Sequence, residues 1–171
     1  MDWKYLHIFY SIILGNFNNK FNMNDLYNVS EVKITYESNN KNKKKLKVNS
    51  SAKIYALMLK NWEQIEYRES FKILLLDVSK QALGINTVSL GGLSNTTVDV
   101  RMILQSALLA NAKEIVACHN HPSGNVRPSY DDDVVTMRIR EASKIIDIKL
   151  IDHLIITKDG YYSYKDAGRL E

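Results

Sequence analysis

The residues best suited to chemistry lie in one stretch, HNHPSGNVRPSYDD, at positions 119–132. His119 and His121 follow an apolar run that is typical of a short strand. In an extended chain both rings would point to the same face, with their backbones about 7 Å apart. Two imidazoles that converge on one point are typical of a metal site, and zinc accepts such nitrogen ligands. Cys118 has the opposite parity, so we expect a small buried apolar side chain there rather than a ligand.

A third ligand could come from any of the three aspartates that follow, Asp131, Asp132 and Asp133. Successive side chains of a helix point about 100° apart, so only one of the three would face the histidines. Geometry alone does not choose among them. Ser129 and Asp132 also match the S-x-x-D capping box, and aspartates are favoured in the first turn of a helix. An alternative is therefore that these residues serve only to begin a helix.

Hydrophobic periodicity indicates the elements that must position these side chains. The predicted strands are 29–36, 71–78, 82–90, 114–118, 148–157 and 161–164. The predicted helices are 51–62, 98–110 and 129–146. In the last helix, one apolar face is predicted from the spacing of Val135, Ile139, Ala142 and Ile146. Strands that alternate with helices indicate an α/β fold.

Composition narrows the class of protein. A chain of 171 residues with 45% hydrophobic and 25% charged residues is close to an average globular protein, which excludes collagen-like, disulfide-scaffold and disordered classes. One domain is the default at this length. A single cysteine excludes an intrachain disulfide and favours a cytoplasmic location. The net charge of +4 permits contact with nucleic acid but does not argue strongly for it.

The N-terminal part of the chain carries one apolar run and, further on, one lysine-rich run. The apolar run within residues 1–15 is too short to span a bilayer, and no small-x-small cleavage site follows it, so we expect neither a membrane anchor nor a secretory signal. One interpretation is that Met23 is the real start and that residues 1–22 are an upstream extension. Five lysines fall between positions 41 and 47; without interleaved aromatic residues, they favour a solvated loop over a nucleic-acid patch.

The pattern H-x-H, seven residues, S-x-x-D resembles the signature of the JAMM (MPN+) zinc metallopeptidases. The longer match is to the RadC-like branch of that superfamily, carried by segments 68–77, 91–117, 119–132 and 148–164. The resemblance implies a single mixed β-sheet flanked by helices, similar to the cytidine-deaminase fold. It assigns residues 29–171 to a RadC-like JAMM/MPN domain and leaves 1–28 as an N-terminal extension.

The resemblance also implies a role for each matched residue. The implied zinc ligands are His119, His121 and Asp132. Ser129 matches the serine that stabilises the oxyanion. Glu69, in the R-E-x-F pattern, matches the glutamate that holds the catalytic water, and Glu66 is its nearest competitor. His153 lies in an apolar strand, where a hydrogen-bonded structural histidine is the favoured interpretation.

The implied activity is that of a zinc-dependent hydrolase, in which a metal-activated water attacks a peptide or isopeptide carbonyl. Three protein ligands leave the fourth position of zinc for water, as in catalytic sites. Two alternatives remain: a DNA-repair-associated protein that binds DNA, and a catalytically silent MPN interaction module. A related zinc deaminase would need H-x-E with P-C-x-x-C, which a chain with one cysteine does not contain.

Overall fold

The computed structural model describes residues 46–91 and 98–170, all of which fall in one compact unit, Thr35–Glu171. The predicted strand 29–36, the extension 1–28 and four of the five lysines, at positions 41 and 43–45, lie outside the described residues. None of the helices in the described part is both long and apolar enough to cross a bilayer.

Helices and strands follow the predicted order along the described chain. The helices are α2 (Ser51–Lys60), α3 (Val100–Leu109) and α4 (Tyr130–Ile145). The strands are β1 (Ser70–Leu76), β2 (Ala82–Leu90), β3 (Glu114–Asn120), β4 (Lys149–Ile156) and β5 (Tyr161–Ser163). β3 runs two residues beyond its predicted end, which places His119 inside the sheet between Phe71 of β1 and Ile155 of β4.

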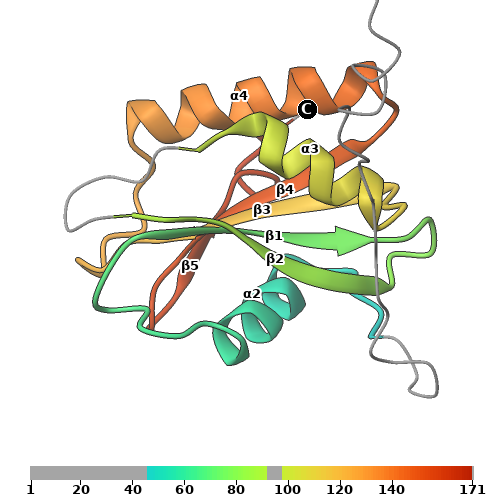
Figure 1. Cartoon of the computed structure of the whole chain (residues 1–171). Coiled ribbons are helices and arrows are strands. Elements are labelled where there is room, and N and C mark those ends of the chain that lie inside the picture. Colours follow the sequence, from blue (N-terminus) through green and yellow to red (C-terminus); the bar gives the residue numbers. More distant parts are fainter. Residues whose placement is uncertain (1–45, 92–97, 171) are drawn as a thin grey trace, which may run out of the picture. The chain divides into compact units, whose positions relative to one another are not determined.

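The strands form one mixed sheet in the order β2-β1-β3-β4-β5. β1 is antiparallel to both β2 and β3, β3 and β4 are parallel, and β5 returns antiparallel to β4. Helices α3 and α4 cover one face, and α2 covers the other (Figure 1). The parallel pair β3 and β4 needs a crossover, which α4 supplies. The predicted α/β fold with a single mixed sheet is confirmed.

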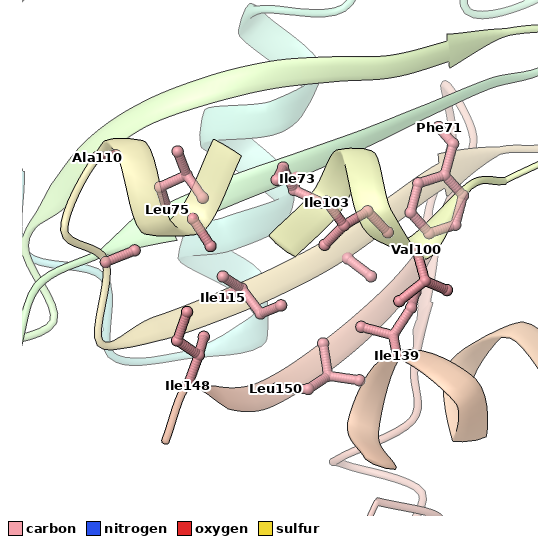
Figure 2. Close-up of a cluster of buried hydrophobic side chains, with 13 residues drawn as sticks. Phe71, Ile73, Leu75, Val100, Ile103, Ala110, Ile115, Ile139, Ile148 and Leu150 are labelled. Atoms are coloured by element: carbon pink, nitrogen blue, oxygen red, sulfur yellow. The ribbon is translucent and has the colours of Figure 1, made fainter. Parts of the chain in front are cut away.

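The sheet is buried on both faces, which explains the continuous apolar run of β1. Phe71, Ile73 and Leu75 pack towards α3 and α4 in one cluster (Figure 2). Leu74 and Leu76 alternate with them and join the second cluster, under α2. The same alternation on β3 sends Cys118 to the α2 side.

Helix α4 packs its predicted apolar face against the core except at one residue: Ile139 is buried, and Val135 and Ala142 pack against the same cluster. Its buried residues are Asp132, Thr136, Ile139 and Ser143. Ile146 is 36% exposed, because the helix ends at Ile145 and Ile146 is its C-cap, so the prediction for that residue is wrong. The most deeply buried stripe of α4 is thus largely polar, and it brings a carboxylate and a hydroxyl against β3 and β4.

A β-bulge in β4 sets which side chains of that strand face α4. Ile115 pairs with Leu150, but Val116 pairs with Asp152, which leaves Ile151 as an extra residue. Such a residue changes the parity of all that follows it. His153 consequently lies on the same face as Leu150, against α4, while Asp152 points to α2.

Candidate metal centre

Two histidines and one aspartate converge where β3 ends and α4 begins. The Nε2 atoms of His119 and His121 lie 3.0 Å apart. Asp132 in the first turn of α4 places Oδ1 3.0 Å from Nε2 of His119 and Oδ2 3.7 Å from Nε2 of His121. One ligand atom from each of the three residues falls within 4.8 Å of the others, so the group could hold a metal ion.

The separations of these atoms suit a tetrahedral ion. Ligands bound at about 2.0–2.1 Å in tetrahedral geometry lie about 3.3 Å from one another. The two histidine nitrogens lie 3.0 Å apart and Nε2 of His119 lies 3.0 Å from Oδ1 of Asp132, both close to that value, while the 3.7 Å from Nε2 of His121 is to the other carboxylate oxygen, Oδ2. Two imidazole nitrogens and a carboxylate oxygen are donors that zinc and several other divalent transition metals accept.

The hydrogen bond of His121 shows which of its nitrogens is free for a metal. Its Nδ1 lies 2.6 Å from the backbone oxygen of Asn125. A carbonyl oxygen only accepts, so Nδ1 carries the hydrogen and Nε2 of the neutral ring presents its lone pair. That lone pair faces the carboxylate of Asp132, and acceptors so close repel unless a cation or a proton lies between them.

The three aspartates point in three directions, as the helical repeat requires. Asp132 is buried and faces the histidines. Asp133 accepts hydrogen bonds from the Tyr164 hydroxyl and from Arg169, away from the histidines. Asp131 is exposed and lines the cavity beside the group. Of the three, the residue that the resemblance selects is the one that meets the histidines.

The capping box and the convergence on the histidines occur together rather than as alternatives. Ser129 is the N-cap of α4, and its hydroxyl accepts from the backbone N–H of Asp132. Oδ2 of Asp132 accepts in turn from the Ser129 backbone N–H and hydroxyl, both at 2.7 Å. Burial would raise the pKa of Asp132, but the adjacent ring of His119 and the hydrogen bonds from Ser129 hold it well below its usual range. The cap therefore fixes the orientation of the carboxylate.

A cavity of about 490 Å³ opens onto this group. Its polar lining includes Glu69, His119, His121, Ser129, Asp131, Asp132 and Arg138, and its apolar wall is formed by Phe71, Val98, Val134 and Val135. The pKa of Glu69 is raised, chiefly by burial and further by Asp132, against the opposing effect of the two histidines. The competitor Glu66 is absent from this lining and forms an exposed 3.4 Å ion pair with Lys158.

The loop that carries Glu69 is held by a residue that sequence reasoning passed over. Asn120 is fully buried, and its side chain accepts from Ser70 N at 2.7 Å and donates to the backbone oxygens of Ile65 and Arg68. These bonds tie both flanks of Glu69 to the end of β3. A buried asparagine between two candidate ligands was the available signal, since buried amides need several partners.

His153 is hydrogen-bonded through both ring nitrogens, as the structural interpretation expects. Its Nε2 lies 2.9 Å from Nδ1 of His119, and its Nδ1 lies 2.5 Å from Oγ1 of Thr136. Burial, and after it the neighbouring His119, lowers the pKa of His153 well below the ordinary value. The part played by Thr136 was missed, although it lies one helical turn from Asp132 and so on the same face.

Cys118 is buried on the opposite side of the sheet among apolar side chains, as expected. Burial raises the pKa of its thiol far above the usual value, so the group stays protonated. Cys118 takes no part in the centre.

Comparison with known proteins gives a consistent picture. Residues 48–169 match the family model described as the RadC-like JAB domain. A UPF0758 protein of Thermotoga maritima is 34% identical over 126 residues, which is 72% of this chain and 55% of that protein. A UPF0758 protein of Flavobacterium johnsoniae is 38% identical over 122 residues, 71% of this chain and 53% of the relative. The chain thus spans about half the length of these curated relatives. By the extent of the family match, this chain belongs to the RadC-like JAB domain family.

Proposed function

We propose that this domain is a zinc-dependent hydrolase of the JAMM type that cleaves a peptide or isopeptide bond. The observation that carries the proposal is the convergence of His119, His121 and Asp132 in one cavity with Glu69. Three protein ligands beside an open cavity are typical of catalytic zinc sites, whereas structural sites are closed by a fourth protein ligand.

The donor set of the three residues supports zinc as the cofactor. Neutral imidazole and carboxylate groups both bind this borderline ion, and no thiolate or second carboxylate joins them among the described residues. Bound there, zinc would supply a Lewis acid and lower the pKa of a water molecule to about 7.

Glu69 is the proposed general base. Glu69 lines the cavity that opens onto the three ligands, and there it would accept a proton from the attacking water and deliver it to the leaving amine. The half-buried setting that raises its pKa makes it a stronger base than an exposed glutamate. Bonds from Asn120 to the neighbouring backbone keep this loop in place.

Ser129 is the proposed donor to the oxyanion of the tetrahedral intermediate. Its hydroxyl hydrogen is directed at Oδ2 of Asp132, which also accepts from the Ser129 backbone N–H. The backbone bond would keep the carboxylate oriented while the hydroxyl turns to substrate. One such donor contributes about 3–4 kcal/mol to the transition state in comparable sites.

A matched pair of glutamate variants tests the proposal. Glu69→Gln should retain zinc, measured by elemental analysis, and lose turnover by about 10²–10⁴-fold, the contribution typical of a general base. Glu66→Gln, which removes an exposed carboxylate from the same loop, should behave as wild type. Turnover is followed by mass spectrometry on a library of linear and lysine-branched peptides. The proposal fails if zinc-loaded wild type releases no more product than the zinc-free protein or Glu69→Gln.

A further inference from the structure

A chain of buried hydrogen bonds starts at His119 and returns to Asp132. Nδ1 of His119 contacts Nε2 of His153 at 2.9 Å, and Nδ1 of His153 contacts Oγ1 of Thr136 at 2.5 Å. Oγ1 of Thr136 donates to the backbone oxygen of Asp132, also at 2.5 Å. All four residues are buried. This series of hydrogen bonds joins two candidate metal ligands, His119 and Asp132, through atoms that do not face the candidate metal site.

The direction of each hydrogen bond follows from the carbonyl at one end. A carbonyl oxygen has no hydrogen to give, and two oxygens 2.5 Å apart repel unless a hydrogen lies between them. The single hydroxyl hydrogen of Thr136 therefore points at Asp132. Thr136 has none left for His153, so its oxygen accepts from Nδ1–H of that ring.

Counting hydrogens in the same way shows which ring nitrogen of His153, and then of His119, carries a hydrogen. His153 is fully buried and its ring nitrogens contact the Thr136 hydroxyl and the His119 ring, neither of which would compensate a buried positive charge, so the ring is neutral and carries one hydrogen, at Nδ1. Its Nε2 must then accept from Nδ1–H of His119. A neutral His119 with its hydrogen on Nδ1 has a bare Nε2, which is the atom that faces His121 and Asp132.

From this geometry we infer that Thr136 and His153 are positioning residues that fix the tautomer of His119 so that Nε2 can bind the metal. The opposite tautomer would place a hydrogen on Nε2 and block coordination. The β-bulge at Ile151 is what brings His153 to the α4 face, and the helical repeat brings Thr136 beneath Asp132. The inference rests on the metal site of the proposed function but not on hydrolysis.

Variants at Thr136 test the inference with little change of shape. Thr136→Val keeps the branched side chain and removes the hydroxyl, which frees His153 to carry its hydrogen at Nε2 and impose the wrong tautomer on His119. Thr136→Ser keeps the hydroxyl. Ser143→Ala is the matched control, because it removes another buried hydroxyl of α4 that bonds only within the helix, to Arg140 O.

Two measurements separate positioning from packing. The first is the protonation of each imidazole nitrogen, from long-range ¹H–¹⁵N NMR spectra of the metal-free protein at about pH 8.5, where histidines of ordinary pKa are neutral. The chain has four histidines, so the spectra are simple to assign. The second is zinc affinity, from competition with a chromophoric chelator.

Wild type, Thr136→Ser and Ser143→Ala should show His119 with its hydrogen on Nδ1 and should bind zinc equally. Thr136→Val should populate the Nε2–H form and bind zinc about 10–100-fold more weakly, the range typical of lost partners of metal-bound histidines. A second pair extends the test: His153→Gln offers an oxygen that can accept from His119, and should retain more affinity than His153→Leu.

The inference is overturned if His119 in wild type carries its hydrogen on Nε2, or if Thr136→Val changes neither the spectrum nor the affinity. It is also overturned if Thr136→Ser or Ser143→Ala weakens zinc binding as much as Thr136→Val, since packing would then explain the loss. A wild-type protein that binds zinc but hydrolyses no peptide would refute the proposed function alone.

Discussion

Replacing Asp132 with asparagine should change the stability of the fold little in the absence of zinc and should remove most of the stabilisation that zinc provides. Oδ2 of Asp132 accepts two hydrogen bonds from Ser129, so the amide oxygen of Asp132→Asn would occupy that position. The amide nitrogen would then replace Oδ1 and point its hydrogens at Nε2 of His119, which lies 3.0 Å from Oδ1. The variant thus replaces a metal ligand with a donor that satisfies the lone pair of His119.

Without metal, we expect the free energy of unfolding to change by no more than about 1 kcal/mol, because the new hydrogen bond offsets the weaker bonds from Ser129. With zinc at 100 times the wild-type dissociation constant, wild type gains about 2.7 kcal/mol, roughly 10 °C in melting temperature. Loss of a ligand should weaken binding at least about 100-fold, since loss of a ligand's partner alone weakens it 10–100-fold. The same zinc concentration would then stabilise the variant by about 0.4 kcal/mol or less.

The assay is thermal unfolding followed by circular dichroism, with each protein measured in a chelator and in excess zinc. Asp131→Asn is the control, because it makes the same change of charge one residue away on an exposed side chain. It should keep the zinc-dependent shift of wild type. The reasoning is refuted if Asp132→Asn retains that shift, or if zinc does not raise the melting temperature of wild type.

Two further predictions concern residues outside the ligand set. Asn120→Ala should retain zinc but lower turnover and destabilise the fold by about 1–3 kcal/mol, because it leaves buried backbone groups beside Glu69 unsatisfied; zinc content, peptide cleavage and urea unfolding check this, and unchanged turnover would contradict it. Burial raises the pKa of Asp152 despite hydrogen bonds from Ser51, Ser163, Lys165 and the backbone of His153. With a raised pKa, the carboxyl of Asp152 stays protonated to a higher pH in the folded state than in the unfolded state. Wild type should therefore lose stability relative to Asp152→Asn as the pH rises from about 4, the ordinary aspartate pKa, through the raised value. Parallel stability curves in urea for the two proteins would contradict this sign.

Local patterns in the sequence were enough to predict the type and order of the elements. The apolar runs of β1 and β3, the apolar spacing of α2 and α3 and the S-x-x-D cap of α4 each involve residues a few positions apart. Local patterns failed at Ile146, which apolar spacing predicted to be buried and which is exposed. The rest of the predicted face packs against the core, but hydrophobicity alone does not indicate the polar residues, Asp132 and Thr136 among them, that α4 also buries.

The sequence by itself determined which residue types are present for chemistry: the paired histidines, the aspartates one turn into a helix and the glutamate before a buried strand. Tertiary structure decided which of them meet. Asp132 rather than its neighbours faces the histidines, and Glu69 rather than Glu66 lines the cavity, because of how α4 and the loop before β1 dock on the sheet. The link from His119 through His153 to Thr136 depends on a one-residue bulge and on contacts 34 and 17 residues apart in sequence, which no local pattern encodes.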